Sequence, residues 1–204
     1  GYMFRYNPGF EFCFKAAREG WLGRLFAIEA VIGKASGAEE RKKLLPYRGG
    51  TMFELGCHLI DAVVTLLGPP SLVSAQARRS GIFGDDLPDN QLATLEYANA
   101  LVTVRSSLVE VAGNVRRQFV VCGDGGTVDL RPLEPPAVRL ALAEARAGFK
   151  RGYQDVKVPS LPRYAADFAD LARVIRGEKE FAWPPAHDLT VQETVLRASG
   201  LPVT

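Results

Sequence analysis

The sequence predicts an α+β fold, with an open, mostly antiparallel β-sheet and helices packed on one of its faces. Helical patterns occupy both ends of the chain, and consecutive strand patterns fill Leu72 to about Val158 between them. The strand–helix alternation of a parallel sheet is missing, and so is the G-x-G-x-x-G turn of a dinucleotide-binding unit. With 204 residues, 47% of them hydrophobic, the chain can form a full core as a single domain.

The first elements are indicated by turn and cap residues. Tyr2–Tyr6 is a short aromatic run with the character of a strand. Asn7 ahead of Pro8 predicts a helix start with Asn7 as N-cap, because proline fits the first helical position. Apolar residues then recur at helical spacing, and Gly20 is expected to end this helix.

Three segments follow before the strand block. Arg24–Gly33 has strand character, and the polar, glycine-containing stretch Lys34–Gly50 predicts a long loop. Thr51–Leu67 is the most apolar helix candidate. A capping box between Thr51 and Glu54 would start it, and Gly68 with the two prolines after it would end it.

Alternation with a period of two residues predicts the strands. Gly123–Gly126 is interpreted as a hairpin turn, because it lacks the Lys-Ser/Thr of a phosphate-binding loop. The alternating sets are Val73-Ala75-Ala77, Leu92-Thr94-Glu96, Val102-Val104-Ser106, Phe119-Val120-Val121, Val128-Leu130, Val138-Leu140-Leu142 and Val156-Val158. Ala75, Ala77, Val102 and Val104 are provisionally placed on a solvent-side face of the sheet, which predicts self-association.

Two helices close the chain. One opens at Pro162, ends at Gly177 and places four apolar side chains on one face: Tyr164, Phe168, Leu171 and Ile175. The last contains Leu189 and Leu196 and ends at Gly200.

Composition excludes several classes of function. The net charge of +2 and scattered basic residues argue against nucleic-acid binding. No apolar stretch approaches the ~18 residues of a membrane span. Cys13, Cys57 and Cys122 are odd in number and widely spaced, which argues against disulfides or a zinc site. We therefore expect reduced thiols and a cytoplasmic protein.

A polar stripe on the apolar helix is the best candidate for chemistry. Glu54, His58, Asp61 and Thr65 fall within an arc of about 60° on a helix that turns about 100° per residue. Both carboxylates could reach the imidazole, which would then be a competent general base near neutral pH. Two structural interpretations stay open: Glu54 closing the capping box, and Asp61 merely holding His58. A metal site on the same residues is weaker, because no fourth ligand accompanies them.

Two further places carry polar residues at element junctions. Arg5, Tyr6 and Asn7 lie between the first strand and helix, where side chains often reach a cleft; capping alone could explain Asn7. At the last helix, Asp188 is interpreted as an N-cap with His187 exposed.

These residues carry a resemblance to a known family. The stretches Gly1–Pro8 (GYMFRYNP), Gly20–Gly23 (GWLG) and above all Gly49–Asp61 (GGTMFELGCHLID) resemble the glucose-fructose oxidoreductase / inositol dehydrogenase / rhizopine catabolism (Gfo/Idh/MocA) family. Tyr164–Gly177 and His187–Gly200 also fit. The resemblance covers nearly the whole chain, and only to the C-terminal part of family members.

The resemblance implies a division of labour. Residues 1–204 would be a single C-terminal substrate-binding and oligomerisation domain, with 1–7 similar to the last strand of a missing Rossmann domain that binds NAD or NADP. The family's Glu-Lys-Pro motif, with its catalytic Lys, has no counterpart here, so this chain alone is expected to be inactive. His58 and Glu54 match the family's His and Asp positions.

By the same resemblance, His58 would exchange the proton of a substrate hydroxyl, and Glu54 would orient it or bind a hydroxyl. Arg5, Tyr6, Asn7 and Asp61 would contact a sugar, a cyclitol or a related polyol. The expected partner is a second copy, bound through the sheet; no metal, nucleic acid or membrane is expected. Three other functions stay open: a non-catalytic assembly module, an NAD-dependent glycoside-cleaving member of the family, and a metal-dependent hydrolase.

Overall fold

The computed structural model describes residues 2–203 and confirms the α+β prediction. Its strands form one eight-stranded sheet in the order β2-β3-β4-β1-β5-β6-β7-β8. β1 pairs in parallel with β4 and antiparallel with β5, and every other neighbouring pair is antiparallel. The strands are β1 (Leu25–Gly33), β2 (Leu72–Arg78), β3 (Asn90–Glu96), β4 (Leu101–Ser107), β5 (Gln118–Gly123), β6 (Gly126–Leu133), β7 (Pro136–Leu142) and β8 (Gly152–Val156).

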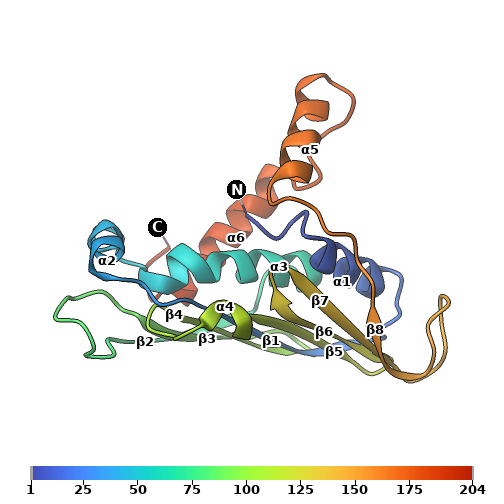
Figure 1. Ribbon diagram of the computed structural model, residues 1–204, viewed down its shortest axis with the longest axis horizontal. Helices are drawn as coiled ribbons and strands as arrows, with labels where there is room; N and C mark the ends of the chain where they lie inside the picture. The colour runs from blue at the N-terminus through green and yellow to red at the C-terminus, as the bar shows by residue number, and fades with distance from the viewer. Residues whose placement is uncertain (1, 204) are drawn as a thin grey trace.

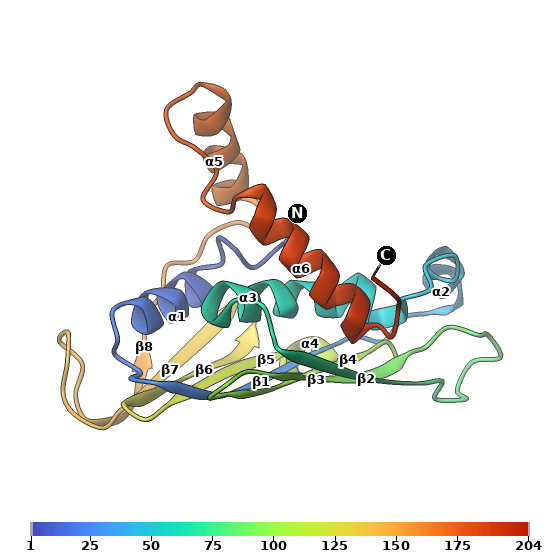
Figure 2. The same ribbon diagram turned by 180° about the vertical axis from the view of Figure 1, so that it is seen from behind.

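The helices gather on one side of this sheet. Figures 1 and 2 show α1, α3 and α6 lying over one face, while no helix covers the opposite face. The helical elements are α1 (Pro8–Arg18), α2 (Ala38–Leu44), the π-helical turn η1 (Met52–Gly56), α3 (Cys57–Leu67), α4 (Gly113–Arg116), α5 (Ala165–Ile175) and α6 (Pro185–Ala198). Helices on one face only leave the other face of the sheet to solvent or to a partner.

The core lies between the covered face and the helices. Ile28, Ala30 and Ile32 of β1 are buried there, and α3 contributes Leu59 and Val63. Alternate residues of each central strand point the same way, which is why the strand pattern could be recognised in the sequence.

The assignment of Val102 and Val104 to a solvent-side face is wrong. Both are fully buried under the helices, because they pair in register with Ile28 and Ala30. Ala75 and Ala77 are exposed, as expected, on the edge strand β2. The uncovered face carries the other set of alternate residues, among them Ala27 and Thr103.

The N-terminal segment is not a strand. Residues 3–6 form turns, closed by hydrogen bonds from Arg5 N–H to the Tyr2 carbonyl (3.4 Å) and from Asn7 N–H to the Phe4 carbonyl (3.1 Å). Phe4 is buried and stacks on Phe10 with ring centroids 4.5 Å apart, so the aromatic residues anchor a turn rather than line a sheet. Gly1, the first residue of the proposed 1–7 strand, lies outside the described residues.

The segment expected to be one long loop contains a helix. α2 is polar, but it is tied to the body through Arg41, whose side chain is 2% exposed. The Arg41 guanidinium pairs with Asp85 (2.5 Å) and Asp89 (3.1 Å) and lies 4.4 Å from the centre of the Phe83 ring. This tertiary ion pair stabilises a helix that has no apolar stripe to announce it.

The predicted capping box does not form, because η1 replaces the first α-helical turn. Thr51 instead hydrogen-bonds the Ser106 hydroxyl (2.7 Å), and Met52 N–H donates to the Gln91 side chain (2.8 Å). A π-helical turn holds one extra residue, which moves Glu54 out of line with His58. The far end of the helix is as expected: Gly68, with φ of 73°, follows α3.

α5 differs most from the expected packing. Its apolar face exists, but no residue of the helix is buried, and Phe168 and Ile175 are 69% and 76% exposed. Figure 1 shows α5 standing away from the sheet. An amphipathic helix with an exposed apolar face is a candidate contact surface.

Candidate active site

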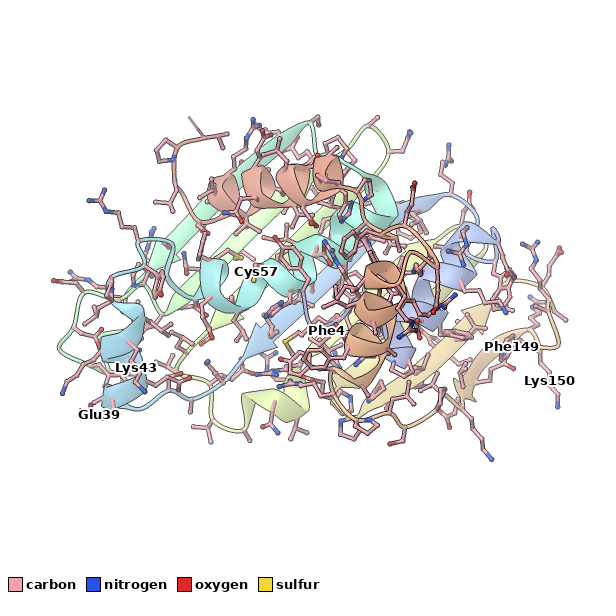
Figure 3. The ribbon with its side chains drawn as sticks, turned by 90° about the horizontal axis from the view of Figure 1, so that it is seen from above. Phe4, Glu39, Lys43, Cys57, Phe149 and Lys150 are labelled. Atoms are coloured by element: carbon pink, nitrogen blue, oxygen red, sulfur yellow. The ribbon has the colours of Figure 1, made fainter. Side chains whose placement is uncertain are left out.

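His58 lies at the start of α3, against the N-terminal turn. Its Nδ1 accepts a hydrogen bond from Met3 N–H at 3.4 Å, and the rings of Tyr2 and Phe4 meet it edge-on at 6.3 and 6.0 Å. Figure 3, with Cys57 and Phe4 labelled, looks down on this part of the molecule from the helix side. An open cavity of about 480 Å³ is lined by His58 together with Tyr2, Arg5, Cys57, Asp188 and Gln192.

The imidazole of His58 is held neutral. Burial lowers its pKa to about 4, and the positive charges of Arg163 and Arg117 act in the same direction. Nδ1 is an acceptor in the Met3 contact, which puts the ring proton on Nε2. At 3.4 Å that contact is long and therefore weak, so exchange to the other tautomer costs little.

Glu54 does not contact His58. Its Oε1 accepts a hydrogen bond from Lys34 Nζ at 3.0 Å, and Lys34 Nζ also donates to Glu40 at 2.8 Å. Burial works against the charge of Lys34, but the two glutamates outweigh it and raise its pKa. Oε2 of Glu54 is buried and has no hydrogen-bond partner within residues 2–203.

Asp61 is fully buried and is bound by two cationic or hydrogen-bonding groups other than His58. Arg5 holds both of its oxygens, with Nη2 at 2.7 Å from Oδ1 and Nε at 3.0 Å from Oδ2. His187 places Nε2 3.2 Å from Oδ1. The carboxylate–imidazole pair of this structure is therefore Asp61–His187, and His187 is mostly buried rather than exposed as expected.

The expected substrate-binding corner is also heavily bonded. The Arg5 guanidinium lies between the rings of Tyr2 and Trp183, 4.8 Å from each centre, and pairs with Asp188 at 2.5 Å. Asp188 makes this ion pair instead of capping α6, whose N-cap position is Pro184.

The next two residues of that corner have structural partners as well. The Tyr6 hydroxyl donates to Asp170 at 2.6 Å, and burial together with this bond raises its pKa. Asn7 caps α1 through bonds from Gly9 and Phe10 N–H, and its amide donates to the Leu133 carbonyl at 3.1 Å. Arg5 and Tyr6 still line a cavity of about 400 Å³ beneath α5.

The six residues singled out from the sequence thus divide into two groups. His58 and Glu54 keep unused polar atoms, whereas Arg5, Tyr6, Asn7 and Asp61 already have partners within the chain. Substrate contact by that second group stays a prediction. Among residues 2–203, no group of three or more His, Cys, Asp or Glu side chains is arranged to hold a metal ion.

Sequence reasoning missed Lys34, His187 and Trp183. Lys34 directly follows the carboxyl end of β1, a position from which polar side chains commonly reach a site, and this signal was available. Trp183 lies in an irregular segment between α5 and α6, and nothing local indicates that it stacks on Arg5.

The fold and the site together define a class. An open mixed sheet with helices on one face and a histidine-bearing helix over it is the architecture of the C-terminal domain of oxidoreductases of the GFO/IDH/MocA type. Residues 13–129, more than half of the chain, match the family model described as GFO/IDH/MocA C-terminal domain. The chain belongs to this family, as the resemblance of its motifs implies.

Solved structures share the fold. The chain aligns with a protein assigned as an oxidoreductase from Thermotoga maritima at a TM-score of 0.78 and 23% identity, over 97% of this chain and 58% of the other. A protein assigned as an NADPH-dependent oxidoreductase from Desulfitobacterium hafniense gives 0.78 and 19%, over 98% and 61%. UDP-N-acetylglucosamine 3-dehydrogenase from Acidithiobacillus ferrooxidans gives 0.77 and 15%, over 97% and 59%.

The chain spans about three-fifths of the length of these structures. No curated protein sequence matches it. Within residues 2–203, no helix has both the length and the apolar character that crossing a bilayer requires.

Proposed function

We propose that this chain is the substrate-binding domain of an NAD(P)-dependent oxidoreductase that acts on a sugar, a cyclitol or a related polyol, with His58 as the proton-transfer group. The observation that carries the proposal is a neutral, partly buried imidazole that borders an open cavity, on the helix bearing the family's motif. A neutral imidazole can accept the proton of an alcohol as that alcohol is oxidised.

The described residues do not fit a whole dinucleotide. The one parallel strand pair among residues 2–203, β1 with β4, has the antiparallel strands β2 and β3 along the chain between its members, so no glycine-rich turn leads from strand to helix there. Such a turn is what places a pyrophosphate on a helix N-terminus. We therefore assign the cofactor to another domain of a longer protein, and we expect residues 1–204 alone to be inactive and to bind NAD(H) weakly.

The chain's own residues would bind the substrate and handle its proton. To accept a proton at Nε2, His58 must first carry its hydrogen on Nδ1, which loses only the long bond to Met3. Glu54 offers its free oxygen one helical turn away. With pKa lowered by burial and by two arginines, His58 remains unprotonated, and hence able to accept, throughout the neutral range.

His58→Asn in the complete protein tests this assignment. Turnover of a panel of sugars and cyclitols with NAD and NADP should fall by about 10²–10⁴, the usual contribution of a positioned acid–base group. The melting temperature should stay close to that of the wild type, because Asn can still accept the Met3 hydrogen bond. Wild-type turnover by the folded variant would remove His58 from the mechanism and favour a non-catalytic assembly module.

We further propose a cytoplasmic location. Cys13, Cys57 and Cys122 are unpaired, which suits a reducing compartment. Burial raises the pKa of the Cys13 and Cys57 thiols to about 12, so both stay protonated and unreactive.

A further inference from the structure

One carboxylate oxygen near the proposed active site lacks a partner. Oε2 of Glu54 is buried without a hydrogen bond from any of residues 2–203, while Oε1 of the same group is bound by Lys34. A buried acceptor left unpaired costs free energy, and such groups call for a specific explanation. Glu54 already has a cation beside it, so the missing partner is a neutral donor.

Both sides of the Lys34–Glu54 pair are fixed to the same end of the sheet. The backbone of Lys34 donates to the Ser107 carbonyl (3.0 Å) and accepts from Glu110 N–H (3.2 Å) just beyond the strands β1 and β4. The turn that carries Glu54 is anchored through Thr51 and Met52 to side chains of β4 and β3. The orientation of the Glu54 carboxylate is therefore set by tertiary contacts and not by its own helix.

We infer that Lys34 is a positioning residue of the proposed active site, which holds Glu54 by Oε1 and so presents Oε2 to a hydroxyl group of the bound substrate. This inference rests on the proposed function. It explains why the π-helical turn directs Glu54 toward Lys34 rather than His58. It also gives the two polar groups separate tasks: Glu54 binds one hydroxyl of a polyol, and His58 exchanges the proton of another.

The substitution Lys34→Arg separates positioning from simple charge pairing. Arginine keeps the positive charge and can still reach Glu40, but its planar fork binds both oxygens of a carboxylate. It would therefore occupy Oε2 and compete with the substrate hydroxyl. We expect KM for the best polyol to rise about tenfold or more, with kcat within about threefold, because the lost bond serves ground state and transition state alike.

The experiment compares four complete proteins: wild type, Lys34→Arg, Lys34→Gln and Lys42→Arg. Lys42 is the matched control, since it pairs with Glu39 at 2.7 Å on the exposed side of α2. Kinetics are measured with D-glucose, D-galactose and myo-inositol, and melting temperatures are recorded for each variant. Lys34→Arg and Lys34→Gln should raise KM, Lys34→Arg should melt near wild type, and Lys42→Arg should match wild type in both respects.

The outcomes distinguish the two proposals. A wild type that oxidises a polyol, with Lys34→Arg at an unchanged KM, overturns the positioning role and leaves the proposed function standing. A wild type that neither binds nor oxidises any polyol overturns both. If Lys34→Gln fails to fold, the stable Lys34→Arg variant still decides the question.

Discussion

The protonation of His58 couples one side chain to the stability of the whole domain. Burial lowers its pKa in the folded state to about 4, against about 6.5 in an unfolded chain. Between these values the unfolded state binds a proton that the folded state does not. Stability should therefore fall as the pH drops from about 6.5 toward 4, by up to about 1.4 kcal/mol for each pH unit crossed.

Urea unfolding at pH 7 and pH 5 checks this expectation. The wild type should lose more stability between the two pH values than His58→Gln does, since glutamine does not titrate. The difference between the two proteins isolates His58 from His187 and from the carboxylates. Equal losses would mean that His58 is protonated in the folded state at pH 5.

Asp61 provides a second prediction at the scale of a residue. It is 1% exposed and bound by Arg5 and His187. Asp61→Asn leaves the Arg5 guanidinium short of its buried counterion, and such losses typically cost about 3–5 kcal/mol. Asp155→Asn is the matched control, because that carboxylate is 92% exposed and its pair with Arg139 is long, at 3.8 Å. Surface pairs of this kind contribute about 0–1 kcal/mol.

The measurement is the free energy of unfolding for both variants. A loss of under 1 kcal/mol for Asp61→Asn would show that the buried cluster is not a stabilising element. It would also reopen the prediction that Asp61 meets a substrate.

At the scale of elements, the π-helical turn depends on residues far away in the sequence. Gln91 is buried on β3, and its side chain accepts a hydrogen bond from Met52 N–H at 2.8 Å. Gln91→Leu leaves that N–H unpaired in the core, which costs about 1–3 kcal/mol. We also expect KM for polyols to rise, because the turn that sets Glu54 loses an anchor.

Gln76→Leu is the control for this change. Gln76 lies on the neighbouring strand β2 and is exposed, so the same substitution should be close to neutral in both melting temperature and KM. If the two variants behave alike, the turn does not need Gln91.

Local signals were enough to predict most elements and not enough for the site. Asn7 and Pro8 start α1 through their own backbone chemistry, and alternation reveals the strands because one sheet face is covered by helices. The π-helical turn was missed since Ser106 and Gln91, not a neighbouring residue, hold it. Glu54 was consequently assigned to the wrong partner, although both it and His58 were correctly singled out as polar positions on an apolar helix.

At the scale of the whole molecule, the uncovered sheet face is its largest regular surface. We propose that a second copy of the chain covers it. Ala27 and Thr103 lie near its middle on β1 and β4, and both are only partly exposed in the single chain. Faces of this kind often form twofold interfaces.

Light scattering on wild type and Thr103→Arg tests this assembly. The wild type should have twice the mass of a 22.2 kDa chain, and Thr103→Arg should shift toward the monomer, because the new charge would be buried without a partner. Ala38→Arg on the exposed start of α2 is the control and should remain dimeric. A wild type that is monomeric at high concentration contradicts the proposal.

The raised position of α5 also determines where the chain can be cut. From residue 143 to residue 190 no side chain is buried, and burial resumes only in α6, with Val191, Val195 and Ala198. Segments of low local stability are the preferred targets of proteases. A brief digestion should therefore nick the polypeptide within 143–184, yet the two fragments should stay together, since α6 remains seated on α3 (Figure 2). The molecule is, in effect, already divided into two complementary pieces that could be produced separately and recombined.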